Sequence, residues 1–220
     1  MTAGHLSATI TTGSGHGRLR RIGLTGGIGS GKSTVARMWR ARFASQLIDA
    51  DAISRSLTAA GGAAIEPIAA HFGDSAIGAD GAMDRDRMRA RVFADPAARQ
   101  QLQAILHPLI QQAMVEALCQ AAQQGFSSAL LDIPLLVEST HWRDRLDAVI
   151  VVDCPEALQI LRVMQRSGLS ESVTRSIIAN QASRSQRLAA ADTVICNGDI
   201  PLLELEQQVI RAGEVMLATA

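Results

Sequence analysis

A glycine-rich segment early in the chain carries the residues best suited to bind an anion. Gly26, four intervening residues, and then Gly31, Lys32 and Ser33 satisfy the pattern G-x-x-x-x-G-K-[ST]. The glycines let consecutive backbone N–H groups curve around a phosphate without interference from Cβ atoms, and a following helix points its partly positive N-terminus at the same place. We predict that this segment binds the phosphates of a nucleotide.

The use of lysine supports this prediction. The chain has 21 basic residues, and Lys32 is its one lysine. A compact ammonium on a flexible stem fits between β- and γ-phosphates, whereas the forked guanidinium of arginine suits bidentate pairing. We therefore predict that Lys32 contacts the β- and γ-phosphate oxygens and that Ser33 contacts Mg²⁺. The alternative, a glycine-rich turn with an incidental cation, is disfavoured by the rarity of the motif.

Two carboxylates follow the second predicted strand, at residues 46–48. If that strand continues, Asp49 and Asp51 lie side by side, because alternate residues of a strand face the same way. Carboxylates that close repel each other unless a cation or a shared proton relieves them, and open α/β sheets bind ligands at the carboxyl ends of their strands. We predict a functional pair. The alternative is that one of the two caps a helix at 52–56.

Two further acids end predicted strands. Asp132 closes the strand at 128–133, and it is a candidate for orienting magnesium through water or, alternatively, for capping a helix or loop. Asp153 follows the strand at 147–152, and we expect it to cap the next helix, because Pro155 falls in the first turn of that helix.

A basic segment begins in the helix predicted at 156–166, which we expect to bury Leu158, Leu161 and Met164. Arg162 and Arg166 lie one helical turn apart with no acid among residues 158–165, and an external anion would offset their repulsion of roughly 0.2–0.5 kcal/mol. Further arginines lie in a predicted helical hairpin. We interpret this hairpin as a lid that brings cations to a transferring phosphoryl group, the alternative being a basic surface pair. The hairpin arginines are Arg175, Arg184 and Arg187.

The elements that must position these residues indicate an α/β protein with the P-loop NTPase fold: a five-stranded, mostly parallel sheet flanked by helices, with a helical substrate-binding insertion and a helical lid. Continuous β-branched runs bounded by turns are typical of parallel strands that are covered on both faces. The predicted organisation is a flexible leader at 1–20, a nucleotide-binding core at 21–57, 126–164 and 190–220, an insertion at 58–125 and a lid at 165–189.

The insertion is predicted to be almost all helix, at 66–72, 84–93, 96–106 and 108–123, the last two helices each beginning with a proline. Its alternating arginines are open to two interpretations, a solvated face or an anion site. They are Arg85, Arg87, Arg89 and Arg91.

Composition excludes several classes of function. Hydrophobic residues make up 47% of the 220 residues, enough for a sizeable core, and the formal net charge is zero, so no broad attraction to nucleic acid or anionic membrane is expected. The apolar runs are too short to cross a bilayer. Three widely spaced cysteines suggest reduced thiols in a cytoplasmic protein, and we expect a monomer.

With the loop, the acids, the insertion and the lid in this order, the chain from about residue 21 onward resembles the dephospho-CoA kinase family. The signatures that carry the resemblance are LTGGIGSGKST, IDAD followed by Arg55, HFG at 71–73, LHPLI at 106–110, PLLVE at 134–138, VVD at 151–153 and MQR at 164–166. The resemblance implies transfer of the γ-phosphoryl group of ATP, with Mg²⁺, to the ribose 3′-hydroxyl of dephospho-CoA.

By the same resemblance, Asp51 matches the acid beside the accepting hydroxyl, and Arg162 matches the arginine that steadies the transferred phosphoryl group. The predicted catalytic residues are Lys32, Asp51 and Arg162. The predicted ATP contacts are Gly27, Gly29, Ser30, Gly31, Lys32, Ser33, Thr34, Arg166 and Asn197, and the predicted acceptor contacts are Asp51, Arg55, Phe72, His107 and Leu135.

Two other functions compete with this one. A kinase for another small acceptor, such as a nucleoside monophosphate or shikimate, would share the loop and the lid. A nucleotide-dependent switch or motor is disfavoured, because reading guanine through N-K-x-D needs a second lysine, and Asp132 is followed by Ile133 and Pro134 rather than by a catalytic glutamate.

Overall fold

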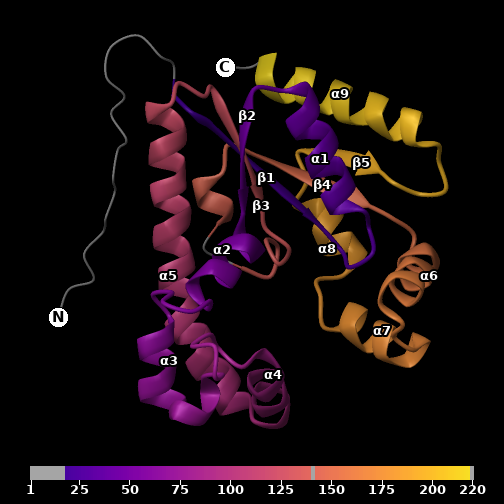
Figure 1. Cartoon of the computed structure of the whole chain (residues 1–220). Helices are drawn as coiled ribbons and strands as arrows, with labels where there is room; N and C mark the ends of the chain where they lie inside the picture. The colour runs from indigo at the N-terminus through magenta and orange to yellow at the C-terminus, as the bar shows by residue number, and fades with distance from the viewer. Residues whose placement is uncertain (1–17, 140–141, 219–220) are drawn as a thin grey trace.

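The computed structural model of the protein describes residues 18–139 and 142–218, and its centre is a five-stranded sheet in the order β2-β3-β1-β4-β5 (Figure 1). All four strand pairs are parallel, which confirms the predicted fold class. The strands are β1 Arg20–Gly26, β2 Ser45–Asp49, β3 Ser128–Asp132, β4 Ala148–Asp153 and β5 Thr193–Cys196.

Alternate residues of the central strands point to opposite faces of the sheet and belong to two separate hydrophobic cores. In β4, Ile150 and Val152 pack with α1 (Lys32–Arg42) and α9 (Leu202–Ala218) on one face of the sheet. Val149 and Val151 pack on the opposite face, with the second half of α5 (Pro96–Gln123). Every residue of β3 and β4 is buried, as expected of strands covered on both faces.

The insertion has a small core of its own, below the sheet in Figure 1. After α2 (Ala50–Leu57), the chain forms α3 (Ile65–Phe72), the 3₁₀ turn η1 (Asp74–Ala76) and α4 (Arg85–Ala94) before it enters α5. A cluster that includes Ile68, Phe72 and Met88 joins these helices to the first half of α5. The insertion can therefore hold its shape through contacts that do not involve the sheet.

The prediction of two helices at 96–106 and 108–123 is wrong, because α5 runs unbroken through Pro108. A proline inside a helix removes one hydrogen bond and costs about 3 kcal/mol. The two halves of α5 bury residues in different cores, Ala98 in the insertion and Met114 and Leu118 against the sheet. Burial at both ends offsets the cost of the proline and keeps the helix continuous.

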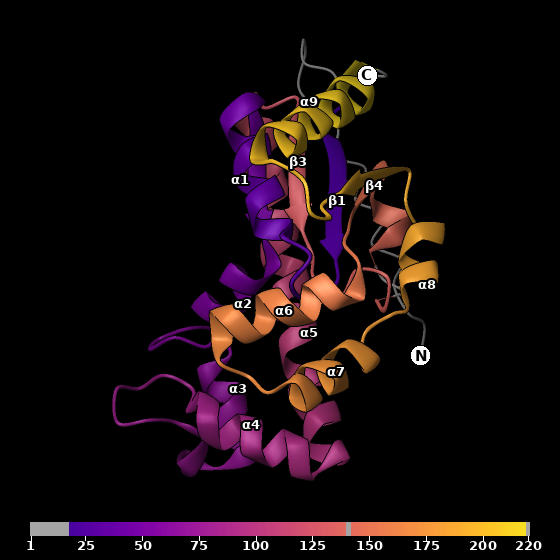
Figure 2. The same ribbon diagram turned by 90° about the vertical axis from the view of Figure 1, so that its right-hand side faces the viewer.

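The predicted lid at 165–189 contains the end of α6 (Glu156–Ser167), then α7 (Glu171–Ala179) and α8 (Arg184–Ala189), and the name lid is used below for these three helices. Figure 2 shows α6 and α7 at the same end of the molecule as the insertion. The predicted buried face of α6 is wrong. Its buried residues are Gln159, Ile160 and Val163, whereas Leu161 and Met164 are 49% and 37% exposed and Leu158 is only partly buried.

Of the leader predicted at residues 1–20, residues 1–17 lie outside the described residues. Its predicted end is too late, because Leu19 is buried in the core around α5 and Arg20 begins β1. Arg18 and Arg21 both pair with Asp147, at Nη2–Oδ1 distances of 2.6 and 3.1 Å. Within the described ranges, no helix has the length and apolarity required to cross a bilayer.

Candidate functional site

The phosphate-binding loop joins the end of β1 to the start of α1. In the sheet, β1 lies between β3 and β4. Gly29 and Gly31 have φ angles of 75° and 86°, in the left-handed region that favours glycine. Gly31 is the N-cap of α1 and offers no side chain to the first turn. The N–H of Thr34 donates to the Gly31 carbonyl oxygen at 2.9 Å, which leaves those of Lys32 and Ser33 available to an anion.

Asn197 braces this loop from the strand at the far edge of the sheet. It follows β5, is buried, and donates from Nδ2 to the carbonyl oxygen of Ser30 at 2.7 Å. A Cβ atom at Gly31 would lie 2.1 Å from the same Nδ2, so no larger residue fits there while Asn197 holds the loop. Asn197, predicted as an ATP contact, therefore fixes the shape of the glycine-rich loop.

Lys32 forms an ion pair with Asp132, the last residue of β3. Asp132 is 7% exposed, and this burial raises its pKa, against the effect of Lys32 and with a further contribution from Asp49 and Asp51. Asp49 lies opposite Asp132 in the β2–β3 register. The carboxyl edge of the sheet thus places one carboxylate, that of Asp132, against the Lys32 ammonium group beside the loop, with Asp49 on the neighbouring strand.

The predicted side-by-side arrangement of Asp49 and Asp51 on a continuing strand is wrong. The strand ends at Asp49, which is the N-cap of α2 and accepts a hydrogen bond from the N–H of Ala52 at 2.9 Å. Asp51 lies in the first turn of α2 and is exposed. Arg55 of the same helix approaches Asp49, with Nη2 3.7 Å from Oδ2. Asp49 therefore has the structural role, and Asp51 is left accessible.

Asp153 does not cap the helix that follows it, contrary to prediction. The N-cap of α6 is Pro155, without a side-chain hydrogen bond. Both oxygens of Asp153 instead accept hydrogen bonds from Arg184 of α8, from Nε at 2.8 Å and from Nη2 at 2.7 Å. These bonds are the main reason that the pKa of Asp153 lies below its ordinary value. The pair ties the lid to the sheet.

Arg162 reaches the segment after β5, with no carboxylate partner in the described part of the chain. Its Nη1 donates to the carbonyl oxygen of Asn197 at 3.0 Å, and its Nη2 donates to that of Gly198 at 2.9 Å. Neutral carbonyls position a guanidinium without neutralising it, so its charge remains available to a ligand. Arg166, one turn later, is exposed.

The acceptor contacts predicted in and beside the insertion occupy very different environments. Phe72 is buried in the insertion's core, with the guanidinium carbon of Arg91 4.9 Å from its ring centroid, so it is a packing residue of α3. His107 is exposed on α5, and Leu135 is 50% exposed in the turn after β3.

The arginines of α4 are all exposed, and their bonds lie within the insertion itself, which favours the solvated interpretation over an anion site. Arg85 donates to the hydroxyl of Thr58, and Arg87 and Arg91 donate to the carbonyl oxygens of Ser75 and Phe72. Arg89 lies 3.8 Å from Asp86 and is largely exposed.

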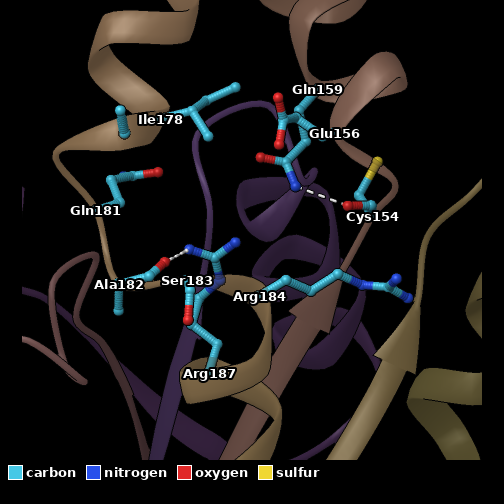
Figure 3. A pocket seen from close by; sticks show the side chains of 10 residues that line it. Cys154, Glu156, Gln159, Ile178, Gln181, Ala182, Ser183, Arg184 and Arg187 are labelled. Atoms are coloured by element: carbon cyan, nitrogen blue, oxygen red, sulfur yellow. Dashed lines mark hydrogen bonds between the residues drawn. The ribbon is translucent and has the colours of Figure 1, made fainter.

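Sequence reasoning missed Gln159 and Gln181, with which the lid touches the loop, and singled out Arg187 only as one of several lid arginines. Gln181 accepts a hydrogen bond from the N–H of Ile28 at 3.0 Å, and Gln159 and Arg187 both approach Gly27. Figure 3 shows Gln159, Gln181 and Arg187 around one pocket, with a volume of about 280 Å³. A contact between residues 28 and 181 leaves no local pattern in the sequence. The one signal in the sequence was Gln159, a polar residue among the apolar residues of α6.

A glycine-rich phosphate loop, followed by a helix and placed at the carboxyl edge of a five-stranded parallel sheet beneath a helical lid, defines a P-loop kinase. A family model described as dephospho-CoA kinase matches residues 20–201. The chain therefore belongs to the dephospho-CoA kinase family.

Individual relatives agree with this assignment. The chain is 53% identical over 191 residues to the dephospho-CoA kinase of Albidiferax ferrireducens, covering 87% of this chain and 90% of the relative. The crystal structure of TT1252 from Thermus thermophilus matches with a TM-score of 0.77 and 29% identity, covering 91% of this chain and 98% of the other. The dephospho-CoA kinase from Campylobacter jejuni matches in fold, with a TM-score of 0.68, 23% identity and the same coverage.

Proposed function

We propose that the protein transfers the γ-phosphoryl group of ATP to the ribose 3′-hydroxyl of dephospho-CoA, giving CoA and ADP. In this reaction the 3′-oxygen forms a bond to the γ-phosphorus, the bond from that phosphorus to the β–γ bridging oxygen breaks, and the hydroxyl proton passes to a base. The observation that carries the proposal is the pairing of Lys32 with Asp132 beside the glycine-rich loop, in a chain of this family.

The donor site follows from the loop. The loop from Gly27 to Thr34 surrounds the phosphates, with the backbone N–H groups of Ile28, Ser30 and Thr34 already bonded within the protein. Lys32 leaves Asp132 to contact the β- and γ-oxygens. The ion pair supports this assignment, because it already holds the ammonium group beside the loop, where a phosphate can replace Asp132 as its partner. Arg162 and Arg166 supply positive charge from α6 to the transferring group, and Asn197 keeps the loop in shape.

The residues beside the loop also fit Mg²⁺. This ion takes oxygen ligands, keeps several waters and is commonly held by one or two carboxylates together with substrate phosphates. Ser33 is exposed in the first turn of α1, and the Asp132 carboxylate lies at the same sheet edge. Within the described residues, no group of three or more His, Cys, Asp or Glu side chains is placed to hold a metal. Bound Mg²⁺ would neutralise charge on the β- and γ-phosphates.

The acceptor side is formed by α2, the insertion and the turn after β3. Asp51 is accessible at the start of α2, and we assign it to orienting and deprotonating the 3′-hydroxyl. Arg55, His107 and the exposed Leu135 are the surface groups available to the rest of dephospho-CoA, while Phe72 supports them from within the insertion. On this proposal residues 58–125 form the CoA-binding domain and residues 165–189 the lid. We also propose a monomeric, cytoplasmic enzyme that binds neither nucleic acid nor membranes.

ADP release in the presence of Mg-ATP, measured against a panel of acceptors, tests the proposal. Dephospho-CoA should be the preferred acceptor, with CoA detected by mass as the product. Shikimate and nucleoside monophosphates should give no more than the background rate. A faster reaction with either of them, or no phosphorylated dephospho-CoA, would refute the proposal.

A further inference from the structure

Arg187 of α8 is a buried cation with no acidic partner in the part of the chain that the structure describes. The residue is 7% exposed, and no carboxylate oxygen lies within 4.0 Å of its guanidinium among residues 18–139 and 142–218. Its one hydrogen bond is donated by Nη1 to the carbonyl oxygen of Ala182. Asp153 is near enough for Arg187 to help lower its pKa, but both oxygens of Asp153 already bond Arg184.

A buried charge of this kind is costly. The free-energy cost of removing an ion from water is offset in proteins by an opposite charge and by hydrogen bonds. A single neutral carbonyl supplies no charge and too few acceptors for the five N–H groups of a guanidinium. The other lid arginines show the usual solution. Arg175 pairs with Glu156 and Glu171, so it is not one of the free cations that the predicted lid would bring to a phosphoryl group, and Arg184 pairs with Asp153. Arg187 therefore lacks a counter-charge that its neighbours have.

The guanidinium lies directly against the phosphate-binding loop. A Cβ atom at Gly27 would be 3.0 Å from Nη2 of Arg187 and 2.8 Å from Oε1 of Gln159. In Figure 3 the guanidinium of Arg187 points toward Gln159, whereas that of Arg184 extends away from it. An anion held by the loop therefore binds within reach of Arg187.

A second buried polar group faces the same glycine. Gln159 is 3% exposed, and its Oε1 atom has no hydrogen-bond partner among the described residues, while its Nε2 donates to the carbonyl oxygen of Cys154 at 2.6 Å. A neutral amide oxygen can accept an N–H from Arg187 after a small shift, but it cannot neutralise the charge. The hydrogen bond from Ile28 to Gln181 keeps this part of the lid on the loop.

We propose that Arg187 is a phosphate-binding residue, whose guanidinium contacts the phosphate tail of the nucleotide in the loop and stabilises negative charge during transfer. The proposal rests on the proposed function for the reaction, but its binding step requires only a nucleotide. It adds to Arg162 and Arg166 a third arginine, one that the fold brings to the opposite end of the loop from Asn197.

The test compares Arg187→Ala with Arg175→Ala, a matched variant that removes an exposed, acid-paired arginine from the same lid. Calorimetry with Mg-ATP and no acceptor should show at least about tenfold weaker binding for Arg187→Ala, and kcat/KM for ATP should fall about 10²–10³-fold, as for loss of a preorganised donor. Added guanidinium ion should restore part of this activity. Arg175→Ala should stay within about twofold of wild type on both measures.

Wild-type affinity and turnover in a correctly folded Arg187→Ala variant would overturn the proposal, as would equal losses in Arg175→Ala. If Arg187→Ala does not fold, Arg187→Lys carries the same test, because an ammonium keeps the charge but loses bidentate geometry. Weaker Mg-ATP binding is then expected, and wild-type binding refutes the idea. Should wild type bind ATP but fail to phosphorylate dephospho-CoA, while Arg187→Ala loses ATP affinity, the proposed acceptor is wrong and the role of Arg187 stands.

Discussion

The lid and the insertion both present several arginines, and they use them in opposite ways. In α4 of the insertion, Arg87 and Arg91 donate to carbonyl oxygens of their own domain and hold its turns together. In the lid, Arg187 is buried against the phosphate loop without an acid. The comparison teaches that the number of arginines in a segment does not indicate anion binding. The burial of each guanidinium and its position relative to the loop do.

A similar difference is expected between residues that act in catalysis and residues that stabilise the fold. Charges at the edge of the sheet should matter for turnover more than for stability, and charges or apolar groups in the insertion should do the reverse.

Replacing Lys32 with alanine should break the chemistry most severely. The ammonium group is the compact cation of the loop, and we expect turnover to fall by about 10³-fold or more while the protein stays folded. The measurement is steady-state ADP formation, with circular dichroism as the folding control. Lys32→Arg should also be impaired, because a guanidinium does not fit the same space. Turnover close to wild type in Lys32→Ala would remove the loop from the mechanism.

The two aspartates around α2 offer a sharper comparison. Asp51→Asn should lower kcat by about 10²–10³-fold through loss of a general base, with Mg-ATP affinity unchanged. Asp49→Asn is the matched control, since asparagine also caps helices and should preserve both the cap and most of the activity. Rate measurements on both variants, with ATP titrations, decide the matter. Equal losses of kcat would show that the two carboxylates act together.

Removing packing from the insertion should produce the opposite pattern. Met88 is 2% exposed in the insertion's core, and Met88→Ala should destabilise the protein by about 2–5 kcal/mol through lost burial and a cavity. Urea unfolding measures this loss. We expect KM for dephospho-CoA to rise and the affinity for Mg-ATP to stay unchanged, since the loop is held by the sheet. A parallel loss of ATP affinity would contradict the independence of the insertion.

A milder change tests the arginines of α4. Arg91→Ala removes a hydrogen bond to the Phe72 carbonyl and the contact with its ring, and should cost about 1–2 kcal/mol of stability. Turnover under saturating substrates should remain within about twofold of wild type. The variant is thus the counterpart of Arg187→Ala, and reduced Mg-ATP affinity in Arg91→Ala would erase the distinction between the two regions.

The smallest expected effect concerns the tie between Asp153 and Arg184. Hydrogen bonds from Arg184 lower the pKa of Asp153 below its ordinary 3.8, so the tie stabilises the folded state fully above that value and is lost as the pH falls through the lowered pKa. Hydrogen exchange in α8, corrected for its intrinsic pH dependence, should show reduced protection only in this acidic range. Asp153→Asn should lack the change, and an identical profile in the variant would rule out this tie as its cause.

Local patterns in the sequence were enough to predict the parallel sheet, the loop from Gly26 to Ser33 and most helices. These features depend on residues that are neighbours in the chain, namely β-branched runs, helical periodicity and glycines that permit a left-handed turn. The position of Lys32 at the start of a helix was predictable for the same reason. Capping by Asp49 was only the alternative, and the favoured prediction of a longer strand was wrong.

Tertiary structure alone decided the partners of the charged groups. Asp153 pairs with Arg184, 31 residues away, instead of capping α6, and Gln181 reaches Ile28 across 153 residues. The continuity of α5 through Pro108 likewise depends on two cores that only the folded chain creates. Hydrogen bonds and burial of this kind arise between segments brought together by packing, so no pattern within one segment records them. For that reason the sequence identified a basic lid, but only the fold distinguished Arg187 from the arginines around it.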